Sequence, residues 1–120
     1  MNTLALVFVS IVIFLHIFFL VLEMFLWDTP YGRRVFGTKQ AFAKESKAMA
    51  ANQGLYNGFL AVGLIWGLIL GIEGFAITVF FLCCVIMAGV FGGITVNKRI
   101  FFFQAVPAIL GLVFLFLAQS

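Results

Sequence analysis

Charge is scarce in this chain. Only 9% of its 120 residues are charged and 65% are hydrophobic, with a mean hydropathy of +1.25. Soluble domains carry roughly 25% charged residues, and a domain of this length cannot hide so much apolar surface in its own core. The composition therefore excludes a soluble globular protein and predicts an integral membrane protein.

Groups that bind metals or carry catalysis are equally few. There is one histidine, and the two cysteines, Cys83 and Cys84, are adjacent, with no further Cys or His at metal-ligand spacing. Neighbouring helical residues point about 100° apart, so we expect neither a disulfide nor a zinc site. The chain also lacks a nucleophile elbow, a phosphate-binding loop and paired carboxylates. We predict no metal and no cofactor, identify no catalytic residues, and favour a non-enzymatic protein.

Long apolar segments occupy most of the chain. About 20 residues cross the hydrocarbon core of a bilayer as a helix. The apolar segments are residues 3–27, 48–70, 75–96 and 101–118. Pro107 lies inside the last one, where it should kink the helix or remove one backbone hydrogen bond. We predict an all-α membrane protein in which four transmembrane helices form a bundle, a single domain over residues 1–120.

The first apolar segment differs from a secretory signal peptide. A signal has a basic start and a small-residue cleavage site, whereas this chain starts without charge and the segment ends at Trp27. We expect residues 3–27 to stay in the mature protein as a membrane span.

The connections between the segments carry all seven Lys and Arg residues. Five lie in the hydrophilic segment 28–47, and Lys98 and Arg99 precede the last span. With four spans these connections share one side, which the positive-inside rule makes cytoplasmic, so both termini lie outside. The net charge of +3 is thus explained by the membrane topology. We predict a multi-pass protein of the cell membrane. Its expected partner is the lipid bilayer, and we expect no nucleic-acid partner.

Two connections have local signals of their own. Residues 29–32 (TPYG) are typical of a turn, and Thr38 can cap a helix that runs from Lys39 without a breaker to Gly71. Residues 71–74 (GIEG) predict a tight reversal between antiparallel helices.

Polar residues within the apolar segments mark a candidate site, because such groups are costly in a membrane. His16 lies near the middle of the first segment, and Glu23 lies about 10 Å nearer its cytoplasmic end. Four polar residues of the second segment fall within an arc of about 140° at the depth of Glu23. The candidate ligand-binding residues are Glu23, Asn52, Gln53, Tyr56, Asn57, His16 and Gln104. We predict a polar pocket in the cytoplasmic half of the bundle, with Glu23 as its acid.

A purely structural interpretation of these residues is also open. Amides and a phenol between packed helices can serve only as interhelical hydrogen bonds. Glu23 can pair with Arg33, Lys98 or Arg99 near the interface, and a lone histidine is more often a packing residue than a proton carrier.

Small residues predict close helix packing. Gly63, Gly67 and Gly71 recur at four-residue spacing, as do Gly89 and Gly93. Such seams let helix backbones approach, either within the bundle or between copies in a homo-oligomer.

Three stretches resemble a known family. They are residues 22–27 (LEMFLW), 29–33 (TPYGR) and 51–61 (ANQGLYNGFLA). They are similar to a family of small bacterial membrane proteins known only as a domain of unknown function, with residues 52–58 (NQGLYNG) as the most specific motif. The resemblance covers essentially the whole chain and implies four spans, but no activity, substrate or catalytic residue.

Small multidrug-resistance transporters offer a second comparison, because they share the size, the four spans and an acid in the first helix. Two features depart from them: Glu23 lies near the cytoplasmic end of its segment, and the basic residues all fall on one side. The comparison stays an analogy.

Three functions are compatible with these observations. The first is binding of a small amphiphile or lipid headgroup in the cytoplasmic-leaflet pocket. The second is proton-coupled transport of a small cationic molecule, with Glu23 exchanging a proton for the substrate. The third is a membrane-embedded enzyme of the isomerase type that uses His16 and Glu23 as acid and base.

Overall fold

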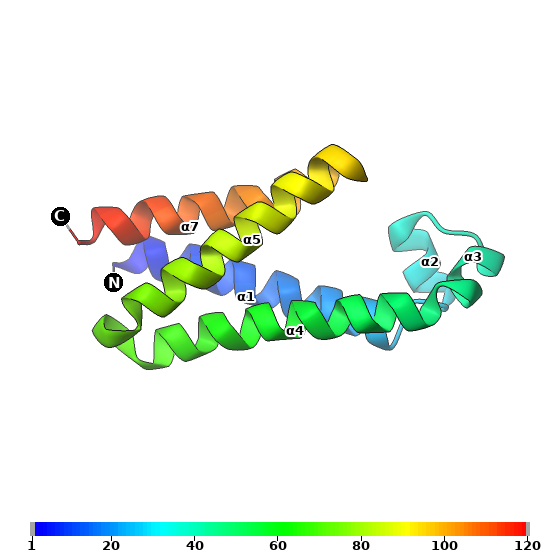
Figure 1. Cartoon of the computed structure of the whole chain (residues 1–120), viewed down its shortest axis with the longest axis horizontal. Coiled ribbons are helices and arrows are strands. Elements are labelled where there is room, and N and C mark those ends of the chain that lie inside the picture. The colour runs from blue at the N-terminus through cyan, green and yellow to red at the C-terminus, as the bar shows by residue number, and fades with distance from the viewer. Residues whose placement is uncertain (1, 120) are drawn as a thin grey trace. The chain divides into compact units, whose positions relative to one another are not determined.

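The computed structural model describes residues 2–119, and every regular element in that range is helical (Figure 1). The elements are α1 (Thr3–Met24), α2 (Pro30–Phe36), α3 (Gln40–Glu45), α4 (Lys47–Ile69), the 3-10 helix η1 (Gly71–Gly74), α5 (Phe75–Thr95), α6 (Lys98–Ile100), the π-helix η2 (Phe101–Ala105) and α7 (Val106–Leu117). The predicted all-helical class is confirmed for the described residues. They form two compact units: one joins the chain up to Leu15 with the chain from Leu60 onward, and the other is His16–Phe59.

Three helical segments are long and apolar enough to cross a membrane: Thr3–Met24, Gly71–Thr95 and Lys98–Leu117. The protein is therefore a helical membrane protein with three candidate spans. Helix α4 has 23 residues but is not among them, because its first half carries Asn52, Gln53 and Asn57. The four-span arrangement and the single domain stay predictions.

The hydrophilic segment is more structured than we expected. The predicted turn at residues 29–32 is instead the start of α2: Pro30 takes the first helical position, where its missing N–H costs nothing. Thr29 caps this helix, because its Oγ1 accepts from the Gly32 N–H (3.1 Å) and donates to the Leu26 carbonyl (2.7 Å).

The predicted continuous helix from Lys39 is also wrong. Helix α3 ends at Glu45, and α4 begins at Lys47. Ser46 separates them, and its hydroxyl donates to the Phe42 carbonyl (2.7 Å), a bond that competes with the regular backbone ladder. Thr38 is not a cap, since Lys39 precedes α3 and the buried Thr38 Oγ1 has no hydrogen-bond partner among the described residues.

Replacing Thr29 by alanine should lower the free energy of unfolding by about 1 kcal/mol, the usual cost of losing an N-cap. Thermal unfolding in detergent micelles measures this effect. Thr29→Ser keeps the capping oxygen and should stay close to wild type. Thr38→Val removes a hydroxyl that has no partner, so it should cost nothing. Equal losses in Thr29→Ala and Thr38→Val would contradict the capping role.

The unit that contains α5 and α7 has a tightly packed core, and these two helices lie side by side in it (Figure 1). Gly71 has a φ of +63°, in the left-handed region that favours glycine, and η1 makes the predicted reversal. Pro107 was expected to disturb its helix, and the residues before it form the π-helix η2. There the Val106 N–H donates to the Phe101 carbonyl, five residues back. A π turn of this kind absorbs the hydrogen bond that proline cannot make.

Four of the five seam glycines lie against other helices of the same unit, and the exception is Gly71, where nothing lies within 4 Å of an added Cβ. A Cβ on Gly67 would sit 2.2 Å from Thr78 Oγ1, and one on Gly89 would sit 2.6 Å from the Ala105 nitrogen. These glycines let α5 approach the end of α4 and η2. A homo-oligomer stays a prediction.

Candidate functional site

A carboxylate held by two amides lies within the unit His16–Phe59. The side chain of Glu23, on the last turn of α1, is only 3% exposed. Gln53 Nε2 donates to Glu23 Oε2, and Asn57 Nδ2 donates to Glu23 Oε1 at 2.5 Å. Gln53 and Asn57 are four residues apart and therefore share one face of α4. The structure thus brings together three of the predicted site residues.

Two glycines bring α4 close enough to α1 for these bonds. A Cβ on Gly54 would lie 2.7 Å from Met24 Cγ and 3.1 Å from Glu23 Cβ, and a Cβ on Gly58 would lie 2.7 Å from Leu20 Cδ1. Residues 52–58 therefore combine two functions in one helical face. The glycines allow the approach, and the amides on the same side satisfy the carboxylate.

Tyr56 and Asn52 occupy a different position from the one we expected. Both are exposed, Tyr56 at 57%, and neither is a hydrogen-bond partner of Glu23 in the described chain. The Tyr56 ring contacts that of Phe59, with centroids 6.0 Å apart. Exposure leaves both side chains available to a ligand, but they do not orient the carboxylate.

His16 lies two turns before Glu23 on α1. His16 is fully buried and makes an edge contact with the Phe19 ring, with centroids 5.8 Å apart. His16 and Glu23 are seven positions apart on α1, about 10 Å of helix rise, so a substrate would have to span two turns to touch both. Gln104 lies in η2, which belongs to the other unit, and is half-buried.

The structure answers the question for one of the partners that the sequence left open for Glu23, namely Arg33. Arg33 Nη1 binds Asp28 Oδ1 at 2.8 Å, so pairing of Arg33 with Glu23 is wrong. Both hydrogen-bond donors to Glu23 are uncharged amides.

One polar contact in this unit was missed from the sequence. Trp27 donates its indole N–H to Ser46 Oγ at 3.0 Å, and its ring centroid lies 4.9 Å from that of Phe36. The two residues are 19 positions apart and follow no common period, so no pattern in the sequence could have paired them.

The Glu23 carboxylate has hydrogen-bond acceptor sites that the two amides do not use. An ionised carboxylate has about four lone-pair sites, and two amide donors occupy only two of them. Gln53, the partner of Glu23 Oε2, is itself an exposed residue. Further hydrogen-bond donors would therefore not have to displace either amide.

Comparisons with known proteins place this site within a family. The family model described as "Protein of unknown function (DUF1304)" matches residues 10–116, which include Glu23 and residues 52–58. The chain is also 29% identical over 114 residues to "Uncharacterized protein YpaA" of Lactococcus lactis subsp. lactis (strain IL1403), covering 92% of this chain and 96% of that protein. No solved structure matches. Since the family model spans nearly the whole chain, the protein belongs to the DUF1304 family.

Proposed function

We propose that the protein binds the head of a small amphiphile or lipid at Glu23, on the side of the membrane that carries the basic connections. The buried Glu23 carboxylate held between Gln53 and Asn57 carries this proposal. A buried acid is costly unless it is well satisfied, and these residues are arranged to keep one in place.

The charge of the site favours a ligand head that is a cationic amine. Glu23 accepts hydrogen bonds from neutral amides, and the nearby Arg33 is engaged by Asp28. An ammonium group supplies the opposite charge and up to three donors for the remaining lone pairs. A neutral or anionic head lacks one or both of these.

The proposal includes a four-span topology, in which α4 also crosses the membrane. If α4 did not cross the membrane, the basic residues of 28–47 and Lys98 with Arg99 would lie on opposite sides, against the positive-inside rule. If α4 crosses, all seven share the cytoplasmic side and the termini lie outside. At 23 residues α4 is long enough, and the bonds of Gln53 and Asn57 to Glu23 offset the cost of their amides in the bilayer.

Binding of a fluorescent long-chain alkylamine to the purified protein tests the proposal. Glu23→Gln keeps the size and removes the charge, and Asn57→Ala removes one of the two amides that hold the carboxylate. We expect a loss of affinity of about tenfold or more in Glu23→Gln, since charge-assisted hydrogen bonds are roughly twice as strong as neutral ones, and a smaller loss in Asn57→Ala.

Glu45→Gln is the matched control, because Glu45 is an exposed acid of α3 in the same unit. It should bind like wild type. Unchanged affinity in both Glu23→Gln and Asn57→Ala would rule the site out.

Proton-coupled transport is the second candidate, because Glu23 lies in a helix that is itself long and apolar enough to span the membrane. A carboxylate at that place can exchange a proton for a cation. If the protein is a transporter, the flux of the amine into liposomes that contain it should depend on pH. An equal flux in Glu23→Gln would contradict proton-coupled transport.

A further inference from the structure

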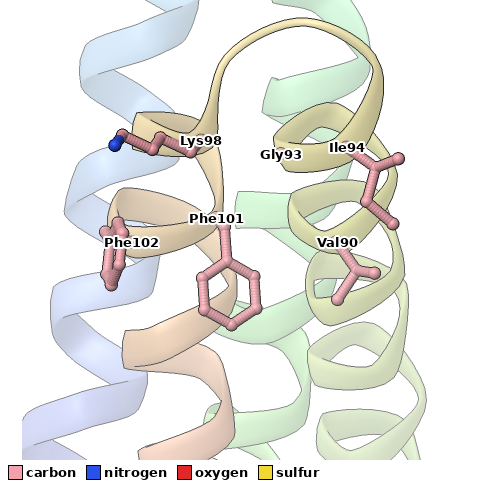
Figure 2. Close-up of a pocket in the computed structure, with 6 residues that line it drawn as sticks. All are labelled: Val90, Gly93, Ile94, Lys98, Phe101 and Phe102. Carbon is pink, nitrogen blue, oxygen red and sulfur yellow. The ribbon is translucent and has the colours of Figure 1, made fainter.

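A second candidate site lies in the other unit, where α5 ends and the last candidate span begins. An open groove of about 410 Å³ is lined by Val90, Gly93, Ile94, Lys98, Phe101 and Phe102, which we call the α5–η2 groove. Figure 2 shows Lys98 beside the connection between the two helices, with the rings of Phe101 and Phe102 one turn below it. The groove is thus apolar along its length, and Lys98 lies at one end with its ammonium group directed away from Val90 and Ile94 in Figure 2.

The apolar surface continues along α5. A second groove of about 330 Å³ is lined by Ile86, Met87, Val90, Phe91 and Ile94, and shares Val90 and Ile94 with the first. Gly93 shapes the junction, because a Cβ there would lie 2.7 Å from Phe101 Cβ. The two grooves together form an elongated apolar track on a helix long enough to cross a membrane. An extended acyl chain has this shape.

The basic end of the track has no acid in its own unit to neutralise it. The chain has four acidic residues, and the one that belongs to this unit, Glu73, lies at the other end of α5, about 31 Å of helix away. Lys98 and Arg99 are adjacent, and the Asn97 side chain caps the backbone N–H of Arg99. Basic side chains at the end of a membrane span attract anionic headgroups.

We propose that the α5–η2 groove binds an anionic phospholipid of the surrounding bilayer, with one acyl chain along α5 and the phosphate on Lys98. The apolar walls match the acyl chain of that molecule, and Lys98, which has no acid near it in its own unit, matches the phosphate. The proposal does not depend on Glu23 and concerns a ligand of the opposite charge.

Native mass spectrometry of the full chain tests the groove. The protein is reconstituted in vesicles of phosphatidylcholine and phosphatidylglycerol in equal amounts and then extracted, and the lipids it retains are counted. Wild type should retain phosphatidylglycerol in preference. Lys98→Gln should reduce that preference about fivefold, the effect expected of one basic side chain near an anionic headgroup.

Two further variants separate the parts of the groove. Val90→Trp fills the track without touching the charge, so retention of both lipids should fall. Lys44→Gln, in the other unit and exposed, is the matched control and should behave like wild type. Equal retention of the two lipids by wild type, or a preference unchanged in Lys98→Gln, would overturn the proposal. A dimer without retained lipid would overturn it as well, by assigning the track to a second copy.

Discussion

Replacing Gly89 by alanine is expected to lower the free energy of unfolding by about 2 kcal/mol, within the usual range for overpacking a tight core. The added Cβ would lie 2.6 Å from the Ala105 nitrogen and 2.8 Å from Ala105 Cβ. Both atoms belong to a packed π turn, and a backbone nitrogen cannot rotate away as a side-chain end can. The helices must therefore separate, which also loosens the contacts around them.

Gly111 provides the matched comparison, since it is a buried helical glycine of the same unit. The nearest atoms to a Cβ at Gly111 are 3.6 Å away, an ordinary van der Waals distance. Alanine is favoured over glycine in a helix by about 1 kcal/mol, so Gly111→Ala should be neutral or stabilising. Thermal unfolding of both variants in the same detergent decides the matter. If Gly89→Ala and Gly111→Ala were destabilised equally, the close contact between α5 and η2 would not be the reason that glycine is needed at position 89.

Replacing Glu23 by leucine should lower the free energy of unfolding by about 2 to 4 kcal/mol. Leucine is similar in size, but it leaves the Gln53 and Asn57 amides without their acceptor. An amide that loses its partner in a dry environment costs about 1 to 3 kcal/mol. Glu23→Gln keeps an acceptor oxygen and should cost less than half as much.

A double-mutant cycle with Asn57→Ala measures the pair directly. We expect a coupling energy of about 1 kcal/mol, above the average of about 0.6 kcal/mol for interhelical hydrogen bonds in membranes, because one partner is a carboxylate. Additive effects of Glu23→Leu and Asn57→Ala would mean that the bond contributes nothing to stability. Unfolding in the same detergent with each variant at equal concentration supplies the four values.

Helix α4 is not among the candidate spans, and the amides of its first half are the reason. The mean hydropathy of α4 is lowered by three amides, Asn52, Gln53 and Asn57. It is therefore too low for the helix to be a candidate span by length and composition. Two of these three amides are hydrogen-bonded to Glu23. The cost of placing them in a bilayer depends on that partner, which a sum over single residues cannot include.

Much of the protein follows from its sequence. The scarcity of charge requires a membrane, because no core of this size could bury the apolar residues. Long apolar segments predict helices, since only a helix satisfies its own backbone in lipid. Helical periodicity also placed Gln53 and Asn57 on one face and at the depth of Glu23.

The tertiary structure decided which of several possible partners each polar group takes. Glu23 is bound by Gln53 and Asn57, while Arg33 binds Asp28 and Tyr56 stays exposed. Only the tertiary structure shows that α3 ends at Glu45 and that Trp27 donates a hydrogen bond to Ser46. Periodicity identifies the face of a helix on which a side chain lies, but a hydrogen bond needs two atoms within about 3 Å of each other. That distance is set by how closely the helices pack, which here depends on glycines such as Gly54 and Gly58.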